Sequence, residues 1–253
     1  EPAIQNIVRQ LIDDVSTENL RSYHKELTLK PHIAAHERDD ELVHWIQNEW
    51  ENAGIENVHL ANYEYLLSWP NQSNPNKIML HDESGEERFR SKFKEDILRP
   101  EDDDPNFIHA FNAYAPAGVA KGKMIYVNYG RVEDLDELES MGISIEGKIA
   151  ISRYGKIFRG DRVKNCQDRG AIAVIMFSDP ADVAVQGTEP ENVYPHTIFL
   201  PGSGIQRGTL FFGSGDPLSP GWPSIENAYR LTTDQVDLPK IPVQPIGYED
   251  AKR

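Results

Sequence analysis

Cysteine is almost absent from this sequence: Cys166 is the only one in 253 residues. No disulfide can therefore form within the chain, and cysteine pairing gives no information about the redox compartment. Long hydrophobic runs are also missing, since no stretch approaches the roughly 18 apolar residues of a membrane-spanning helix. The first residues show no basic and then apolar signal segment, so we expect any targeting element to lie outside the residues given.

Basic residues are few compared with acidic ones. Lys and Arg number 26 and Asp and Glu number 41, which gives a formal charge of −15. This balance argues against nucleic acid and anionic membranes as partners, because both require a cationic surface. A cytosolic protein and a secreted protein fit the composition equally well, and the length suits one large domain or two small ones with a hydrophobic core.

The common catalytic motifs are missing as well. We find no G-x-S-x-G motif, no phosphate-binding Walker loop and no paired cysteines. The G-S-G triplets at 202–204 and 213–215 lack a strand–helix context, so turns are the better interpretation. From the residues alone, the sequence predicts an α/β domain without a visible catalytic apparatus.

One pair of histidines has the spacing of a metal site. His32 and His36 are four residues apart, which on a helix would place both rings on one face. The helical zinc-peptidase motif, however, carries a glutamate directly after the first histidine, and here Ile33 follows it. Pro31 and the polar run predict a helix that begins only near Glu37. We therefore favour a loop histidine over a zinc ligand at His32.

Helical periodicity dominates the first sixty residues. Apolar side chains recur at i, i+3, i+4 and i+7 over residues 4–15. Ser16 or Thr17 can cap a second helix, and a third is predicted over 37–53, with Gly54 ending it. Three helices cannot bury all of this apolar surface against one another, so we expect a larger surface to pack against them.

Strands and helices alternate after residue 121. The predicted strands are 122–130, 147–155 and 171–180, and the helices between them are 132–142 and 160–171. The apolar runs at 148–152 and 171–177 are typical of strands buried on both faces. Outside this region we predict strands at 57–69 and 77–83, an exposed acidic loop at 94–106, and mostly irregular structure over 190–247 that ends in a strand near 241–247.

A single arginine is the most suggestive binding residue. Arg159 lies in the stretch RYGKIFRGDRVKN, flanked by glycines and just before a helix predicted to begin near Asp161. A guanidinium at that place presents a planar fork of donors that suits a carboxylate. The alternative is an ordinary solvated arginine, and the residues alone leave both interpretations open.

One N-glycosylation triplet occurs. Asn71, Gln72 and Ser73 form it within the polar loop SWPNQSNPN. A loop position can accommodate a glycan, although such triplets also arise by chance.

Eight stretches together resemble one family. They are KPHIAAHE, YEYLLSWPNQSNPN, GKMIYVNYGRVEDL, GKIAISRYGKIFRGDRVKNCQDRGA, FSDPAD, LPGSGIQRG, GDPLSPGWPS and IPVQPIGYEDA. Their order across nearly the whole chain resembles the glutamate carboxypeptidase II group, which includes the N-acetylated alpha-linked acidic dipeptidases and the transferrin receptors. The resemblance implies that residues 1–61 are the N-terminal helical part of a split peptidase domain. Residues 62–253 would be the protease-associated, or apical, domain, incomplete at its C-terminal end. The implied fold class is α/β, with a mixed β-sheet and flanking helices.

The resemblance also implies an activity. Members of the family bind two zinc ions through His, Asp and Glu residues that follow the apical domain, and no residue of this chain matches one of them. We therefore expect no catalysis by this chain alone. The implied whole protein is an extracellular, homodimeric, zinc-dependent exopeptidase that acts on peptides, and is either secreted or the ectodomain of a membrane-anchored protein. The remaining peptidase domain, or a second chain, would hold the metals.

A non-catalytic alternative comes from the same family. The chain could belong to a binding protein of the transferrin-receptor kind. The stretch RYGKIFRG argues against this alternative, because the receptors have lost much of that segment.

Two partial sites are implied by matching positions. Arg159 matches the apical-domain arginine that binds an acidic substrate carboxylate. Ser219 and Trp222 match positions that supply oxygen ligands to a structural calcium, Trp222 through its backbone carbonyl only. The glutamates that complete the calcium site would come from the missing part. Asn71 matches a glycosylated position of the family.

Several positions depart from the family pattern. Phe199 is a substrate-binding position at which the carboxypeptidases carry asparagine, and an aromatic ring cannot replace an amide donor. Val183 stands where a tyrosine is usual. Ala35 and His36 replace the glycine and hydroxyl residue of the loop that contains His32. These departures predict an exopeptidase whose substrate specificity is broader than that of an enzyme specific for acetyl-aspartyl-glutamate.

Overall fold

The computed structural model describes residues 2–253, and of Pro2 and Ala3 the backbone only. The chain divides into two compact units. The first comprises residues up to Ala61 together with 104–107, and the second comprises 62–103 and 108–253. Their assignment to a split peptidase domain and an apical domain stays a prediction.

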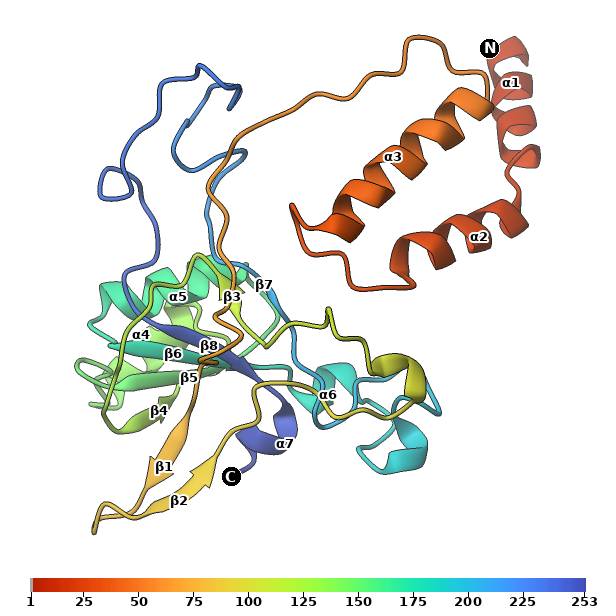
Figure 1. Cartoon of the computed structure of the whole chain (residues 1–253). Coiled ribbons are helices and arrows are strands. Elements are labelled where there is room, and N and C mark those ends of the chain that lie inside the picture. Colours follow the sequence, from red (N-terminus) through yellow and green to blue (C-terminus); the bar gives the residue numbers. More distant parts are fainter. Residues whose placement is uncertain (1) are drawn as a thin grey trace. The chain divides into compact units, whose positions relative to one another are not determined.

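The first unit consists of three helices, coloured red to orange in Figure 1. They are α1 (Pro2–Asp13), α2 (Thr17–Thr28) and α3 (Glu37–Asn52). Ser16 caps α2 by accepting a hydrogen bond from the Asn19 N–H at 3.1 Å. Gly54 follows α3 with a φ of 84°, a conformation that suits glycine after a helix end. The three predicted helices and both end signals are confirmed.

Few contacts hold this unit together. The rings of Tyr23 and Trp45 meet edge to face with centroids 5.8 Å apart, and Arg38 forms an ion pair with Glu26 at 2.7 Å. Leu42 is the buried residue of α3, and α2 buries none. The apolar face of α1 is exposed to solvent; its exposed members are Ile4, Ile7, Val8, Leu11 and Ile12. No helix in the described part of the chain is long and apolar enough to span a bilayer.

The second unit is built on a four-stranded parallel sheet. Its strands, in spatial order, are β4 (Met124–Tyr126), β5 (Ile149–Arg153), β6 (Ala173–Phe177) and β8 (Val243–Ile246). Helices α4 (Val132–Ser140) and α5 (Arg159–Asp168) connect successive strands and pack against the sheet (Figure 1). Their apolar sides meet those of β5 and β6 in one core. The predicted alternation of strands and helices is confirmed.

Smaller elements complete this unit. A hairpin pairs β1 (Met79–His81) with β2 (Glu87–Arg90) in antiparallel fashion, and β3 (Asn112–Ala113) pairs in parallel with β7 (Gly208–Thr209). The short helices are η1 (Pro100–Asp102), α6 (Pro180–Val183), η2 (Pro190–Asn192) and α7 (Tyr248–Ala251). The α/β class with flanking helices is confirmed, and antiparallel pairing is confined to the hairpin rather than mixed into the main sheet.

Two strand predictions were wrong in part. Residues 57–69 form no strand, because their backbone bonds to side chains and loops instead of to a strand ladder. The Leu66 N–H donates to the Asp216 carboxylate at 2.9 Å, and the Glu64 N–H donates to the Ser224 carbonyl at 2.8 Å. Strand β6 is almost fully buried as predicted, whereas β5 alternates between buried and half-buried residues, so one of its faces is only partly covered.

Candidate functional site

Arg159 is the first residue of α5, at the carboxyl end of the parallel sheet. Strand β5 ends at Arg153, and the chain then turns through Gly155 and Lys156, whose φ angles of 108° and 66° are both left-handed. Phe158 is the residue before the helix and has an extended backbone. The carboxyl edge of parallel strands is where α/β proteins place their binding residues. The loop therefore places Arg159 at the carboxyl edge of the sheet, where a binding residue is expected.

The Arg159 guanidinium lies among aromatic rings without an acidic partner. Its Cζ atom is 5.9 Å from the Tyr154 ring centre and 5.8 Å from the Phe158 ring centre. Its Nε atom is buried and has no hydrogen-bond partner. No described carboxylate lies within 4.0 Å of it, although fifteen ion pairs form elsewhere in the described chain. A half-buried cation of this kind has donors available for an external carboxylate.

A second layer of residues supports this arrangement. The Asn112 side-chain amide donates to the Tyr154 hydroxyl at 3.2 Å and to the Gly208 carbonyl at 3.3 Å. The Tyr154 hydroxyl in turn donates to the Gln206 carbonyl at 3.0 Å. Burial raises the pKa of Tyr154, so its hydroxyl stays protonated and able to donate. These hydrogen bonds connect β3, β7 and Tyr154, the residue that follows β5.

Arg162, one turn further along α5, is hydrogen-bonded to the loop between β5 and α5. Its side chain is completely buried. Its Nε donates to the Tyr129 carbonyl at 2.6 Å and one Nη donates to the Gly155 carbonyl at 2.8 Å. Burial lowers the pKa of Arg162. Sequence reasoning missed this residue, because nothing in the pattern of α5 distinguishes it from an exposed arginine.

Phe199 lies on a different loop from Arg159. Its N–H donates to the Thr197 hydroxyl at 3.1 Å, and its carbonyl accepts from the Tyr194 N–H at 2.8 Å. Its side chain is half-buried. These backbone contacts fix the loop, and a role for Phe199 in substrate binding stays a prediction.

Ser219 and Trp222 come together on one turn. The Trp222 N–H donates to the Ser219 carbonyl at 3.1 Å. Because an indole has no oxygen atom, Trp222 can offer a ligand oxygen only from its backbone. The Ser219 hydroxyl donates to the buried Asp216 carboxylate at 2.9 Å. Asp216 also accepts hydrogen bonds from Leu66 and Ser224.

Asp216 was missed in the sequence, where it reads as an ordinary turn residue in GDPLS. Burial alone would raise the pKa of Asp216, but hydrogen bonds from Leu66, Ser219 and Ser224 outweigh that effect and hold the pKa below its usual value.

The described residues do not fit a zinc site. No group of three or more His, Cys, Asp or Glu side chains in residues 2–253 could hold a metal ion. His32 and His36 are both exposed, and the Nδ1 atom of each ring lies 3.2 Å from a nearby backbone carbonyl, that of Lys30 for His32 and that of Ala34 for His36. For calcium, Ser219 and Trp222 provide oxygen atoms of the right kind, but a complete site takes six to eight. Two such oxygen donors do not by themselves make a site, so calcium binding at Ser219 and Trp222 stays a prediction.

Asn71 is exposed on its loop. Its Oδ1 accepts hydrogen bonds from the Ser73 N–H at 3.0 Å and from the Asn74 N–H at 3.1 Å. This turn presents the side chain at the surface, which suits a glycan acceptor. Glycosylation stays a prediction.

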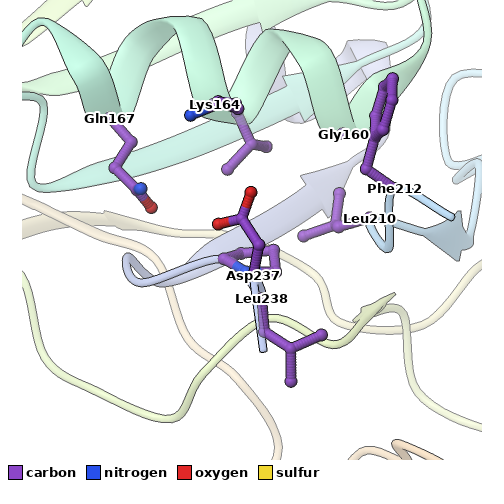
Figure 2. Close-up of a pocket in the computed structure, with 9 residues that line it drawn as sticks. Gly160, Lys164, Gln167, Leu210, Phe212, Asp237 and Leu238 are labelled. Carbon is purple, nitrogen blue, oxygen red and sulfur yellow. The ribbon is translucent and has the colours of Figure 1, made fainter. Parts of the chain in front are cut away.

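A small cavity lies between α5 and residues 237–239 (Figure 2). Its volume is about 30 Å³, which holds one water molecule and no substrate side chain. Gln167 closes one side by accepting a hydrogen bond from the Lys240 N–H at 2.8 Å. In Figure 2 the Phe212 ring stands beside the Gly160 end of the helix, away from Gln167. The cavity is therefore a packing defect and not a binding pocket.

Comparisons with known proteins agree with this architecture. Residues 111–210, which run from β3 to β7 and include Arg159, match the PA domain family. A glutamate carboxypeptidase 2 homolog of Caenorhabditis elegans is 41% identical over 251 residues, covering 95% of this chain and 33% of that protein. The aminopeptidase NAALADL1 of Mus musculus is 35% identical over 252 residues, covering 98% and 33%. A probable glutamate carboxypeptidase, AMP1, of Arabidopsis thaliana is 29% identical over 249 residues, covering 96% and 32%. The chain spans about a third of the length of these relatives.

Proposed function

We propose that this chain, which carries a PA domain and is related over nearly its whole length to glutamate carboxypeptidases, is the N-terminal and apical portion of a zinc-dependent exopeptidase. In the whole protein this chain lines one side of the substrate cleft and binds a carboxylate of the substrate. The remaining peptidase domain, or a second chain, holds the zinc. The rest of the protein also covers the exposed apolar face of α1. An extracellular, homodimeric, calcium-stabilised and glycosylated protein is part of the same proposal.

The observation that carries the proposal is that the guanidinium of Arg159 has no carboxylate partner among the described residues. It is half-buried, its Nε has no partner, and no described carboxylate pairs with it. A substrate carboxylate would supply the missing acceptor through charge-assisted, two-pronged hydrogen bonds. The Tyr154 and Phe158 rings limit where the guanidinium can point, so binding requires little further ordering.

Zinc, when bound in the rest of the protein, would activate a water molecule and polarise the scissile carbonyl. The residues described here act before that step. Arg159 binds and orients the substrate, and Tyr154 and Asn112 hold Arg159 in place. This division of labour predicts that the isolated chain hydrolyses no peptide, even with zinc added.

The experiment compares Arg159→Ala with wild type in the full-length protein. For substrates with an additional acidic side chain, we expect KM to rise about 10- to 100-fold, the usual effect of losing a charge-assisted pair. Neutral substrates should lose less, and Arg159→Lys should restore part of the binding. Equal losses for acidic and neutral substrates would reject the carboxylate role, and a full-length protein without turnover would favour the receptor-like alternative.

A further inference from the structure

His109 is a half-buried histidine in the loop that leads into β3. Its Nδ1 atom is buried and has no hydrogen-bond partner among the described residues. Its ring meets the ring of Phe93 edge to face, with centroids 4.8 Å apart. The imidazole is therefore packed against an aromatic side chain, with one of its two nitrogens closed off from water.

The charged side chains that act on this ring are cations. Lys94 follows Phe93 in the chain, and an Nη of Arg207 donates to the carbonyl of the residue before His109 at 2.7 Å. Glu95 pairs with Arg207 at 2.9 Å, and no described carboxylate lies within 4.0 Å of the His109 ring. Burial, together with the charges of Lys94 and Arg207, holds the pKa of His109 below its usual value. A proton on the ring would thus add a third positive charge without a counter-ion.

The segment 91–96 contacts the loop of His109 directly. The Phe93 carbonyl accepts a hydrogen bond from the Ala110 N–H at 2.8 Å, beside the contact between the Phe93 and His109 rings. Because Lys94 belongs to the same segment, a charge on His109 would repel the segment that its neutral ring packs against.

Two further hydrogen bonds attach this segment to the second unit. The Lys92 N–H donates to the Asp250 carboxylate at 2.7 Å, and the Asp96 N–H donates to the Ser203 hydroxyl at 3.2 Å. Burial raises the pKa of Asp250, so protonation of this carboxyl group favours the folded state as the pH falls. Asp250 therefore opposes any loosening in acid, and the contact at His109 is where acid can weaken the attachment.

We propose that His109 is an acid-sensitive contact: its neutral ring holds the segment 91–96 against the loop before β3, and protonation of the ring releases that segment. The folded pKa lies below the unfolded value of about 6.5, so the stabilisation is complete above about pH 6.5 and is lost as the pH falls through the lower folded value. The effect falls in the range of acidified compartments, about pH 5 to 6. The inference does not depend on the proposed function.

The test is hydrogen exchange of the full-length protein at pH 7.5, 6.5 and 5.5, corrected for the intrinsic rates and followed by mass spectrometry. The peptides of interest contain residues 93–96 and the Ala110 amide. We expect their protection to decrease between pH 7.5 and 5.5 by up to about tenfold, the limit that linkage sets one pH unit below the ordinary pKa of histidine. In His109→Phe the aromatic packing is retained and no charge can form, so protection should stay constant.

Matched variants separate the role of His109 from a general effect of acid. His196 is an exposed histidine of the same unit, so His196→Phe should keep the pH dependence of the wild type. His109→Gln also remains uncharged and provides the same comparison if the phenylalanine variant folds poorly. Protection that is constant in the wild type, or that falls equally in the wild type and in the uncharged His109 variants, would overturn the inference.

Discussion

The guanidinium of Arg159 lies directly against the backbone of Gly208. A Cβ atom added to Gly208 would fall 2.5 Å from Arg159 Cζ and from one Nη. Gly208 belongs to β7, which pairs with β3. The direction of the Arg159 side chain thus depends on a glycine at position 208, about fifty residues further along the chain, which leaves room for the guanidinium.

Gly208→Ala should therefore displace the guanidinium of Arg159. We expect KM for substrates that use the carboxylate contact to rise about tenfold, because the arginine would keep its charge but lose its position. The free energy of unfolding should fall by about 1 kcal/mol, since a guanidinium at the end of a flexible side chain can move aside. The control is Gly215→Ala, which also has a positive φ, 75°, but meets no atom within 4 Å. Identical KM values in the two variants would contradict the prediction.

Arg162→Met should destabilise the second unit more than loss of a surface arginine. It leaves the carbonyls of Tyr129 and Gly155 without the guanidinium donors. The expected loss is about 3 kcal/mol in the free energy of unfolding, measured by denaturant titration. Arg169→Met removes two surface ion pairs, with Asp136 at 2.6 Å and Glu139 at 3.2 Å, and should cost less than about 1 kcal/mol. The reverse order of the two losses would refute this interpretation.

We expect acid to weaken the attachment of residues 62–68 to the second unit, because the Leu66 N–H donates to the Asp216 carboxylate. Its folded pKa lies below the unfolded value of about 3.9, so the carboxylate contributes stability that is complete above about pH 4 and is lost as pH falls through the lower folded value. Protection of the Leu66 amide against hydrogen exchange, corrected for the intrinsic rate, should therefore decrease below pH 4. Asp216→Asn should lower protection at pH 7 and show no further loss in acid. The same pH profile in both proteins would argue against the assignment.

Cys166 should be chemically inert in the folded protein. Burial raises the pKa of its thiol to about 12, and only the thiolate reacts readily. At pH 8 we expect no labelling of Cys166 by iodoacetamide under native conditions and complete labelling in 6 M guanidinium, both followed by peptide mapping. Labelling of the native protein at a comparable rate would show that the site is not buried.

Asn71 should carry a glycan when the full-length protein is expressed in a secretory pathway. The expected result is a decrease in mass after treatment with an N-glycosidase, located to the peptide that contains Asn71. Asn71→Gln should abolish this change. Asn74→Gln is the matched control, because Asn74 is exposed on the same loop but is followed by Pro75 and is no acceptor. A decrease in mass that persists in Asn71→Gln would assign the glycan elsewhere.

The regular elements could be predicted from the sequence because their signals are local. The stripe at 4–15, the Ser16 cap, Gly54 and the apolar strands near 149–153 and 173–177 all act over a few residues. Arg159 at the start of its helix was also visible from its flanking residues. The family resemblance then identified its role as a hypothesis, and the comparisons confirm the relationship.

The sequence by itself determined the order of strands and helices in the parallel sheet, the position of Arg159 at the N-terminal end of a helix, and the excess of acidic charge, because each depends on neighbours along the chain. Only the tertiary structure decided that residues 57–69 bond to Asp216 instead of forming a strand. It also decided that Arg162 is buried and that Gly208 lies against Arg159. Each of these depends on residues that lie far apart in sequence, and no local periodicity or cap signals such a contact.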